Sequence, residues 1–507
     1  MNEPTRSNEA PIAAGVASPG ATDPRRRAKV AALVSTGVFM ASLDLFIVNV
    51  AFPDIAASFS GSSLGGLSWV LNAYAIVFAA ALVPAGRWFD RVGRRRGFLG
   101  GVALFGVASA VCAAAPSLEV LVAARVLQAV GAAMLLPTSL GLLLPEYAPE
   151  QRAGAVALWS AVGGVAAAAG PPIGGLLVEL SWRWVFLVNV PIALAAVLIG
   201  RSLLVERRDP HPGPTPDLLG AGVLAGAVAL LTWGIVEAPD HGWLGARTLV
   251  GAAAALVLAA AFIARSRHHA APVVPPEIIR RRAFAFSTSA SLLFYVAFSA
   301  MLLNGVLVLS GVWGYSTLET GFGLVPGPAM AALVASRGGG LGARFGQRNV
   351  AALGALVFAI GGFIPFTQLT DDPAYVTAFL PGMLVGGFGV GLVLPSMAGA
   401  AFGGLPPALM STGIAVFSVA RQVGSALGVA LLVAVLGDLA GGGAEAAKHG
   451  YLLQVGVALA AGLVALGIRT EPVAASAISP ADAELERELE AEEFAPVPVA
   501  LPAELRA

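Results

Sequence analysis

Long apolar stretches alternate with short polar loops along most of the 507-residue chain. A helix that crosses a lipid bilayer needs about 20 consecutive, mainly apolar residues, and fourteen stretches meet this condition. They lie at residues 30–52, 67–86, 97–115, 118–142, 154–178, 183–204, 217–236, 246–265, 284–307, 317–336, 350–368, 376–400, 411–437 and 450–468. The pattern predicts an all-α membrane protein with fourteen transmembrane helices, because a helix satisfies its own backbone hydrogen bonds in lipid.

Charged residues are few, and their distribution predicts the topology. They make up 12% of the chain, about half of the roughly 25% in a soluble protein. Arginines gather in alternate loops, above all at 86–96, 201–208 and 265–282, whereas the intervening loops carry mostly acids. Because basic loops stay on the cytoplasmic side, we expect a multi-pass plasma-membrane protein with both termini in the cytoplasm. A net charge of zero gives no general attraction to nucleic acid.

The second half of the chain repeats motifs of the first. Residues 131–139 resemble 389–396, and loop 86–96 resembles 339–348, at spacings of about 258 and 253 residues. A parallel repeat of this kind indicates two six-helix bundles. We therefore expect a disordered cytoplasmic tail at 1–28, a first bundle at 29–204, a linker with two additional helices at 205–283, a second bundle at 284–470, and an acidic, disordered cytoplasmic tail at 471–507.

The chain lacks the residue patterns of catalysis, metal binding and nucleotide binding. Its five histidines fall in predicted loops without metal-ligand spacing, and it contains no phosphate-binding G-x-x-x-x-G-K-[ST] sequence. The single cysteine, Cys112, cannot form an intrachain disulfide. We therefore expect neither enzyme activity nor a cofactor, and an ion gradient as the source of energy.

Three charged residues lie deep within apolar stretches: Asp44, Arg125 and Arg421. A charge at the bilayer centre costs about 2.5–3.5 kcal/mol, so such residues usually face a partner or a cavity. At about 1.5 Å per residue, Asp44 and Arg125 fall at the same depth of the first and fourth stretches. Two interpretations follow: Asp44 takes up and releases a proton under the influence of Arg125, or the pair only holds two helices together.

The basic loop 86–96 has a specific spacing of glycine, Asp-Arg and Gly-Arg. It resembles the G-x-x-x-D-R-x-G-R-[RK]-[RK] loop of major facilitator superfamily transporters, whose fold consists of two six-helix bundles. Four further runs resemble sequences of this superfamily, and jointly those of its fourteen-span drug:proton antiporters; they lie at 43–53, 125–131, 182–191 and 421–429. In the second of these runs, Ala129 stands where glycine is usual.

The resemblance implies that several residues control a conformational change. Asp90 is expected to lie beside the start of span 13, near Ser411 and Thr412. The run 170–175 matches a motif associated with antiporters, and it is interpreted either as a bending seam or as a packing motif. The implied gating residues are Gly86, Asp90, Arg91, Gly93, Arg94, Arg95, Gly170, Pro171, Gly174 and Gly175.

The resemblance also implies a function, namely proton-coupled export of hydrophobic small molecules such as drugs or antibiotics by alternating access, performed by a monomer in the bilayer. One alternative is a dedicated exporter of a compound made by the host cell. A more remote one is a membrane sensor that transports nothing. Candidate substrate-binding residues, each alternatively a helix–helix hydrogen bond, are Asn49, Trp69, Tyr74, Gln128, Asn304, Arg421 and Gln422.

Overall fold

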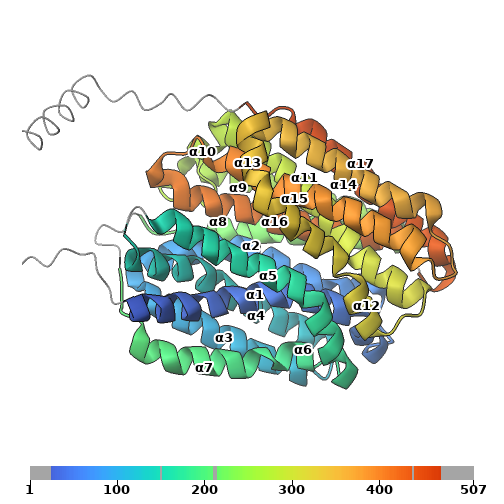
Figure 1. The fold of residues 1–507 in the computed structure, drawn as a ribbon, viewed down its shortest axis with the longest axis horizontal. Helices are drawn as coiled ribbons and strands as arrows, with labels where there is room; N and C mark the ends of the chain where they lie inside the picture. Colours follow the sequence, from blue (N-terminus) through green and yellow to red (C-terminus); the bar gives the residue numbers. More distant parts are fainter. Residues whose placement is uncertain (1–23, 149–150, 209–213, 437–438, 470–507) are drawn as a thin grey trace, which may run out of the picture.

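The computed structural model describes residues 24–148, 151–208, 214–436 and 439–469. Within these ranges the chain is helical, and most helices run along one long axis (Figure 1). The elements are α1 (Pro24–Ser58), α2 (Leu64–Val92), α3 (Arg94–Ala114), α4 (Leu118–Leu143), η1 (Leu144–Glu146), α5 (Arg152–Leu180), α6 (Trp184–Leu187), α7 (Asn189–Leu203), α8 (Leu218–His241), α9 (Ala246–His268), α10 (Pro276–Arg280), α11 (Arg282–Leu307), η3 (Val308–Val312), α12 (Thr317–Gly323), α13 (Pro326–Phe345), α14 (Gln347–Gln368), η4 (Tyr375–Phe379), α15 (Leu380–Phe402), α16 (Pro407–Leu436) and α17 (Leu439–Ala465).

All fourteen predicted transmembrane stretches coincide with long apolar helices. Several spans join two consecutive elements, for example α6 with α7 and α12 with α13. The shortest described span has 19 residues, and at about 1.5 Å per residue it covers nearly the whole hydrocarbon core of a bilayer. The prediction of an all-α protein with fourteen spans is therefore confirmed.

The first helix begins earlier than its apolar stretch suggested. It starts at Pro24, inside the segment expected to be a tail, and proline is favourable in a first helical turn because its missing amide hydrogen is not needed there. Arg26 pairs with Glu146 at 2.6 Å, and Arg27 donates to Gln151 at 2.9 Å. These contacts tie the start of α1 to the connection between α4 and α5. The rest of both expected tails lies outside the described residues.

The two halves of the chain repeat each other in packing. α3 packs along α4 in the first half, and α14 packs along α15 in the second. A Cβ atom on Gly131 would lie 2.7 Å from the backbone nitrogen of Phe105, and one on Gly389 would lie 2.5 Å from that of Phe358. Glycine is needed at both crossings because the backbones approach too closely for a side chain. The internal sequence repeat thus reflects two corresponding helix crossings.

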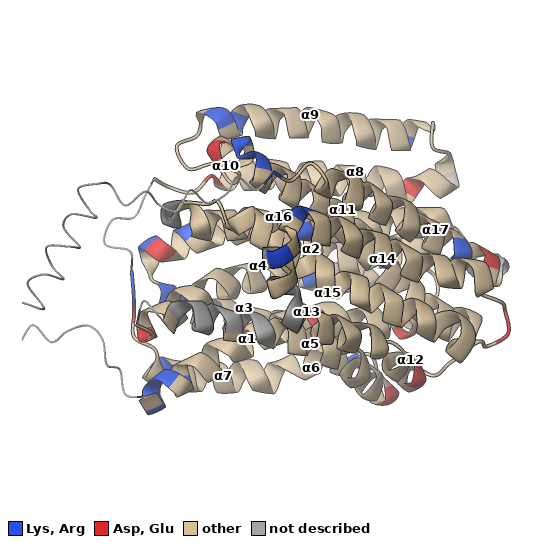
Figure 2. Cartoon of the chain, turned by 45° about the horizontal axis from the view of Figure 1, so that its top comes forward, with Lys and Arg blue, Asp and Glu red and all other residues tan. Residues whose placement is uncertain are grey.

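Helices α8 and α9, which separate the halves in sequence, lie on one side of the bundle (Figure 2). α8 packs against α2 of the first half and α16 of the second, while α9 packs against α8. The contacts of α8 are apolar: Ala221 clusters with Val83 and Val419, and Val228 clusters with Ala426. α8 therefore covers one edge of the junction between the halves.

The two ends of the bundle differ in how closely the halves approach each other. We call the end where α1 begins the basic end, because Lys and Arg gather there (Figure 2), and the opposite end the far end. Toward the far end, one apolar cluster combines Ile47 and Phe52 of the first half with Leu303 and Leu432 of the second. Toward the basic end, two large clusters each belong to a single half. The structure is therefore closed at the far end.

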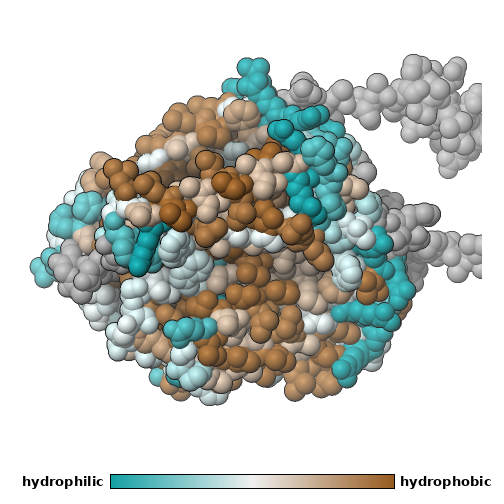
Figure 3. Space-filling view, turned by 180° about the vertical axis from the view of Figure 1, so that it is seen from behind, coloured by the Kyte–Doolittle hydropathy of each residue, from teal (hydrophilic) through white to brown (hydrophobic). Residues whose placement is uncertain are grey.

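The outer surface of the helices is apolar. Leu194 and Leu198 on α7 and Leu256 and Val257 on α9 are each more than half exposed. Figure 3 shows apolar side chains over the middle of one face, with a band of hydrophilic residues at one end. Such a surface suits contact with lipid tails rather than with water.

Candidate functional site

A buried ion pair joins α1 and α4 in the first half. Nη1 of Arg125 lies 2.5 Å from Oδ2 of Asp44, and neither side chain is more than 1% exposed. Removing two charges from water is costly, and only good geometry and further hydrogen bonds offset that cost. The sequence predicted that these residues share one depth, and the structure brings them into contact, which both interpretations of the pair require.

Gln128 and Ser109 complete a network around this pair. Nε2 of Gln128 donates to Oδ1 of Asp44 and to Oγ of Ser109, both at 2.9 Å. Oε1 of Gln128 accepts from Nη1 of Arg125 at 2.6 Å, and Nε of Arg125 donates to the carbonyl of Val70 at 3.0 Å. Helices α1, α2, α3 and α4 therefore meet at one polar centre. Sequence reasoning missed Ser109, because a single serine in an apolar stretch has no distinguishing pattern.

Aromatic rings enclose the guanidinium group of Arg125. Its Cζ atom lies 4.2 Å from the ring centroid of Tyr74 and 5.7 Å from that of Phe186. A desolvated cation over an aromatic ring gains about 2 kcal/mol. Tyr74, a predicted substrate contact, is 1% exposed and forms part of the wall around the ion pair in this conformation.

The basic loop between α2 and α3 turns at Gly93, whose φ of 133° favours glycine because it carries no side chain. Directly after this turn, Nε of Arg94 donates to Oδ1 of Asp90 at 2.6 Å, and Nη1 of Arg94 donates to the carbonyl of Gly141 on α4 at 3.2 Å. These bonds hold the loop on its own half. The expected contact between Asp90 and the start of α16 stays a prediction.

The other predicted residues of this loop lie around the same turn between α2 and α3. Gly86 packs against Pro137 of α4, where a Cβ atom would lie 3.2 Å from the proline ring, and Arg91 stands in the last turn of α2. The backbone nitrogen of Arg95 donates to Oε1 of Glu206 at 3.0 Å. Glu206 was not predicted, because an acid in the loop after α7 gives no sequence signal of its partner.

Two glycines of the run 170–175 in α5 pack against α1. A Cβ atom on Gly170 would lie 2.4 Å from Cβ of Phe46, and one on Gly174 would lie 3.2 Å from Cα of Ile47. Alanine at position 170 would force the helices apart, because real Cβ contacts are never this short. The run therefore sets the distance between α5 and α1.

The same run faces α12 of the second half on its other side. A Cβ atom on Gly175 would lie 2.9 Å from the carbonyl oxygen of Thr317, and one on Gly321 would lie 2.4 Å from that of Pro171. Beside this crossing, Oγ1 of Thr317 donates to Oδ2 of Asp54 on α1 at 2.9 Å. These contacts join the halves at the far end, and the sequence did not single out Asp54 or Thr317.

Two predicted substrate contacts form hydrogen bonds with neighbouring backbone. Asn304 on α11 is fully buried and donates to the carbonyl of Ala447 on α17 at 3.0 Å. Asn49 donates to the carbonyl of Leu45 in its own helix at 2.6 Å. In this conformation Asn304 fits the alternative interpretation of a helix–helix hydrogen bond.

The remaining candidates lie on α2 and α16. Trp69 packs against a cluster that includes Ala426 of the other half. Cζ of Arg421 lies 4.5 Å from the ring centroid of Tyr295 on α11, and Gln422 follows it on α16, partly buried. Tyr74 and Gln128 belong to the Asp44 network, and a substrate site shared by all these candidates stays a prediction.

Fourteen spans, two halves with corresponding helix crossings and a charged network buried in one half define a polytopic membrane transporter fold. The sequence model of the Major Facilitator Superfamily matches residues 34–429. The chain belongs to this superfamily, and it is a multi-pass membrane protein.

Several curated relatives align over most of the chain. The "Tetracenomycin C resistance and export protein" of Streptomyces glaucescens is 33% identical over 80% of this chain and 76% of its own length. The "Multidrug resistance protein Stp" of Mycobacterium tuberculosis is 33% identical over 81% and 76%. The "Cephamycin export protein CmcT" of Amycolatopsis lactamdurans is 33% identical over 84% and 89%.

Solved structures share the fold at low sequence identity. A bacterial homolog of the human lysosomal transporter Spinster, in an inward-facing and unoccupied conformation, superposes with a TM-score of 0.65 at 16% identity, covering 89% of this chain and 100% of that one. The inward-open xylose transporter XylE from E. coli gives a TM-score of 0.60 at 14% identity, covering 91% and 99%.

Proposed function

We propose that this protein exports hydrophobic small molecules, such as drugs or antibiotics, across the plasma membrane in exchange for protons. Membership of a transporter superfamily supports transport, and relatives of 33% identity carry names that describe antibiotic export or multidrug resistance. The observation that carries the proton coupling is the network around Asp44, a fully buried carboxylate paired with Arg125 in mid-span.

In this mechanism a proton neutralises the carboxylate of Asp44, and the buried guanidinium of Arg125 then has no counter-charge. An uncompensated buried charge destabilises its surroundings by about 3–5 kcal/mol. The helices relieve that cost by rearranging, so protonation shifts the balance between two conformations. Because Arg125 also bonds to Gln128 and to the carbonyl of Val70, the rearrangement extends from α1 and α4 to α2.

We further propose that the basic end and both termini face the cytoplasm, in accordance with the positive-inside rule. The far end, where Asp54 bonds to Thr317 and α5 crosses α12, would then face the outside. A substrate would enter between the halves from the cytoplasm and leave after the far end opens.

The test of this function is proton release from energised everted vesicles on addition of a hydrophobic substrate, followed with a pH-sensitive dye. Asp44→Asn keeps the shape and a hydrogen-bond acceptor but cannot titrate, so we expect it to reduce substrate-evoked release to background. Asp372→Asn, at an exposed loop position, is the matched control and should behave as wild type. Undiminished release from Asp44→Asn at equal membrane abundance would show that the proton uses another path.

A dedicated exporter of one compound made by the host cell is the second candidate. It is favoured by the names of two relatives, which each specify a single antibiotic, tetracenomycin C or cephamycin. The same vesicle assay with a panel of unrelated hydrophobic compounds separates the two candidates. A response to one chemical class alone would favour the dedicated exporter.

A further inference from the structure

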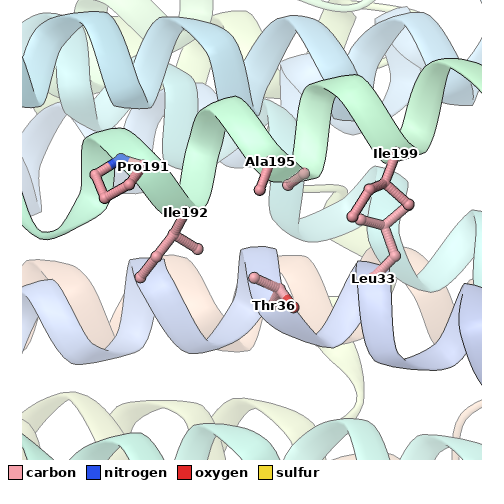
Figure 4. A pocket seen from close by; sticks show the side chains of 7 residues that line it. Leu33, Thr36, Pro191, Ile192, Ala195 and Ile199 are labelled. Carbon is pink, nitrogen blue, oxygen red and sulfur yellow. The ribbon is translucent and has the colours of Figure 1, made fainter.

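A groove on the outer face of the first half lies between α1 and α7 (Figure 4). Its volume is about 370 Å³, and its lining comes from Leu33 and Thr36 on α1 and from five apolar residues of α7 within 191–199. The one hydroxyl in the lining, that of Thr36, donates to the carbonyl of Ala32 in its own helix. The lining of the groove is therefore apolar, and its single hydroxyl group already donates its hydrogen within α1.

Three cations stand where this groove approaches the basic end. Lys29 is exposed and lies four and seven residues before Leu33 and Thr36, so the three side chains share one face of α1. Arg201 is exposed and follows Gly200, at which a Cβ atom would lie 3.3 Å from the side chain of Leu33. The groove and the end of α7 are therefore at one level along the bundle.

Arg95 adds a third cation at the same place. Its Nη2 donates to the carbonyl of Arg201 at 2.5 Å, and its buried Nε has no hydrogen-bond partner. The nearby carboxylate of Glu206 is engaged with the backbone of Arg95 and Arg207 and with the side chain of Arg96. Among the described residues, none of the side chains of Lys29, Arg95 and Arg201 has a carboxylate partner.

We infer that this groove is a binding site for an anionic phospholipid of the membrane, with one acyl chain along α1 and α7 and the phosphate between Lys29 and Arg201. The surface around the groove suits contact with lipid, because the apolar side chains of Leu194 and Leu198 on α7 are more than half exposed. Basic pockets between transmembrane helices bind anionic headgroups, and the apolar wall supplies the complement to the tail. The site is independent of the proposed transport function.

The experiment titrates the full-length protein in detergent with phosphatidylglycerol and, separately, with phosphatidylcholine, and follows the midpoint of thermal unfolding. For the wild type we expect saturable stabilisation by phosphatidylglycerol alone. Lys29→Ala combined with Arg201→Ala should weaken its apparent affinity about 30-fold, the ratio for two contacts of about 1 kcal/mol each. Arg267→Ala, an exposed cation in the last turn of α9, is the matched control and should leave the affinity unchanged.

Two further variants keep the test decisive. Lys29→Arg with Arg201→Lys retains both charges and should retain the affinity, which excludes misfolding as the cause of any loss. Ala195→Phe fills the groove without changing charge and should also abolish the stabilisation. An unaltered response in both the charge-removal and the groove-filling variants would overturn the proposal. So would a loss of transport in Ala195→Phe in vesicles of phosphatidylcholine alone, because the groove would then serve a substrate.

Discussion

Arg125 in the first half and Met383 in the second occupy corresponding positions, separated by the same spacing of about 258 residues as Gly131 and Gly389. The backbones around them are packed alike, since both glycines meet a neighbouring helix too closely for a side chain. The side chains differ completely. Arg125 bonds to a carboxylate, whereas Met383 packs in an apolar cluster with Leu309.

This difference distinguishes the close helix crossing, which both halves share, from the buried ion pair, which only the first of these two places contains. The close crossing of α3 with α4 and of α14 with α15 is common to both halves, so it belongs to the fold. The buried ion pair occurs in one of two otherwise equivalent places, so the fold does not need it. A feature that is costly to bury and absent from the corresponding place in the other half supports our proposal that the first half carries the proton.

The largest effect is expected when the first half is made to resemble the second. Arg125→Met leaves the charge of Asp44 buried without a counter-charge, which should cost about 3–5 kcal/mol of stability and abolish proton-coupled export. Adding Asp44→Asn removes the uncompensated charge and should restore much of the stability without restoring export. Thermal unfolding in detergent and the vesicle assay measure the two properties separately. A double variant as unstable as Arg125→Met would contradict the pairing argument.

The shared crossings should respond equally in both halves. Gly131→Ala and Gly389→Ala each place a Cβ atom within 3 Å of backbone, and overpacking of this kind costs about 1–3 kcal/mol. Gly164→Ala is the control, because a Cβ atom there meets nothing within 4 Å. Thermal unfolding of the three variants checks this expectation. Destabilisation of one half alone would show that the halves do not share their packing.

The contact between the halves at the far end can be broken without touching either core. Thr317→Val and Asp54→Ala each remove the 2.9 Å hydrogen bond. A loss of about 1 kcal/mol, a typical net value for one hydrogen bond, raises the open population about fivefold. The measurement is maleimide labelling of Val50→Cys, a site 1% exposed, in a Cys112→Ser background.

Asp54→Asn is the control for this experiment, because its amide oxygen still accepts from Thr317. It should leave the labelling rate near that of wild type. Equal rates in all variants would mean that the glycine crossing of α5 with α12 closes the far end unaided.

The smallest effect is expected at the basic loop. Asp90→Asn removes a carboxylate proposed to interact with the start of α16, where a helix terminus contributes about 0.3–1 kcal/mol. Turnover should fall about two- to fivefold, with unchanged abundance and a bias toward the state that is open at the basic end. Transport assays at matched membrane abundance test this. Wild-type rates would place the control of that end elsewhere than in this loop.

The sequence predicted those features that the bilayer itself imposes. Fourteen spans follow from the thickness of the hydrocarbon core, and the contact of Asp44 with Arg125 follows from the cost of burying each at the same depth. The start of α1 at Pro24 did not follow, because Arg26 and Glu146 stabilise it through a tertiary contact.

The remaining site residues depend on tertiary packing that no local pattern records. Ser109 and the carbonyl of Val70 become partners of the network only because α2 and α3 pack beside α4. Asp54 and Thr317 are 263 positions apart, and each is unremarkable in its own segment. The sequence shows that Asn304 is a polar residue in an apolar stretch, but it does not show whether the side chain faces a substrate or the backbone of α17. In the structure it donates to that backbone.

Helix α8 covers one side of the junction between the two halves and leaves another side uncovered. Where α2 meets α16, α8 stands between the seam and the surrounding membrane. Where α5 meets α12, no inserted helix covers the crossing in the described part of the chain, and Leu176, Leu180 and Phe322 are more than half exposed. The inserted helix α8 thus makes the two flanks of the junction unequal, because one is covered and the other presents exposed apolar side chains.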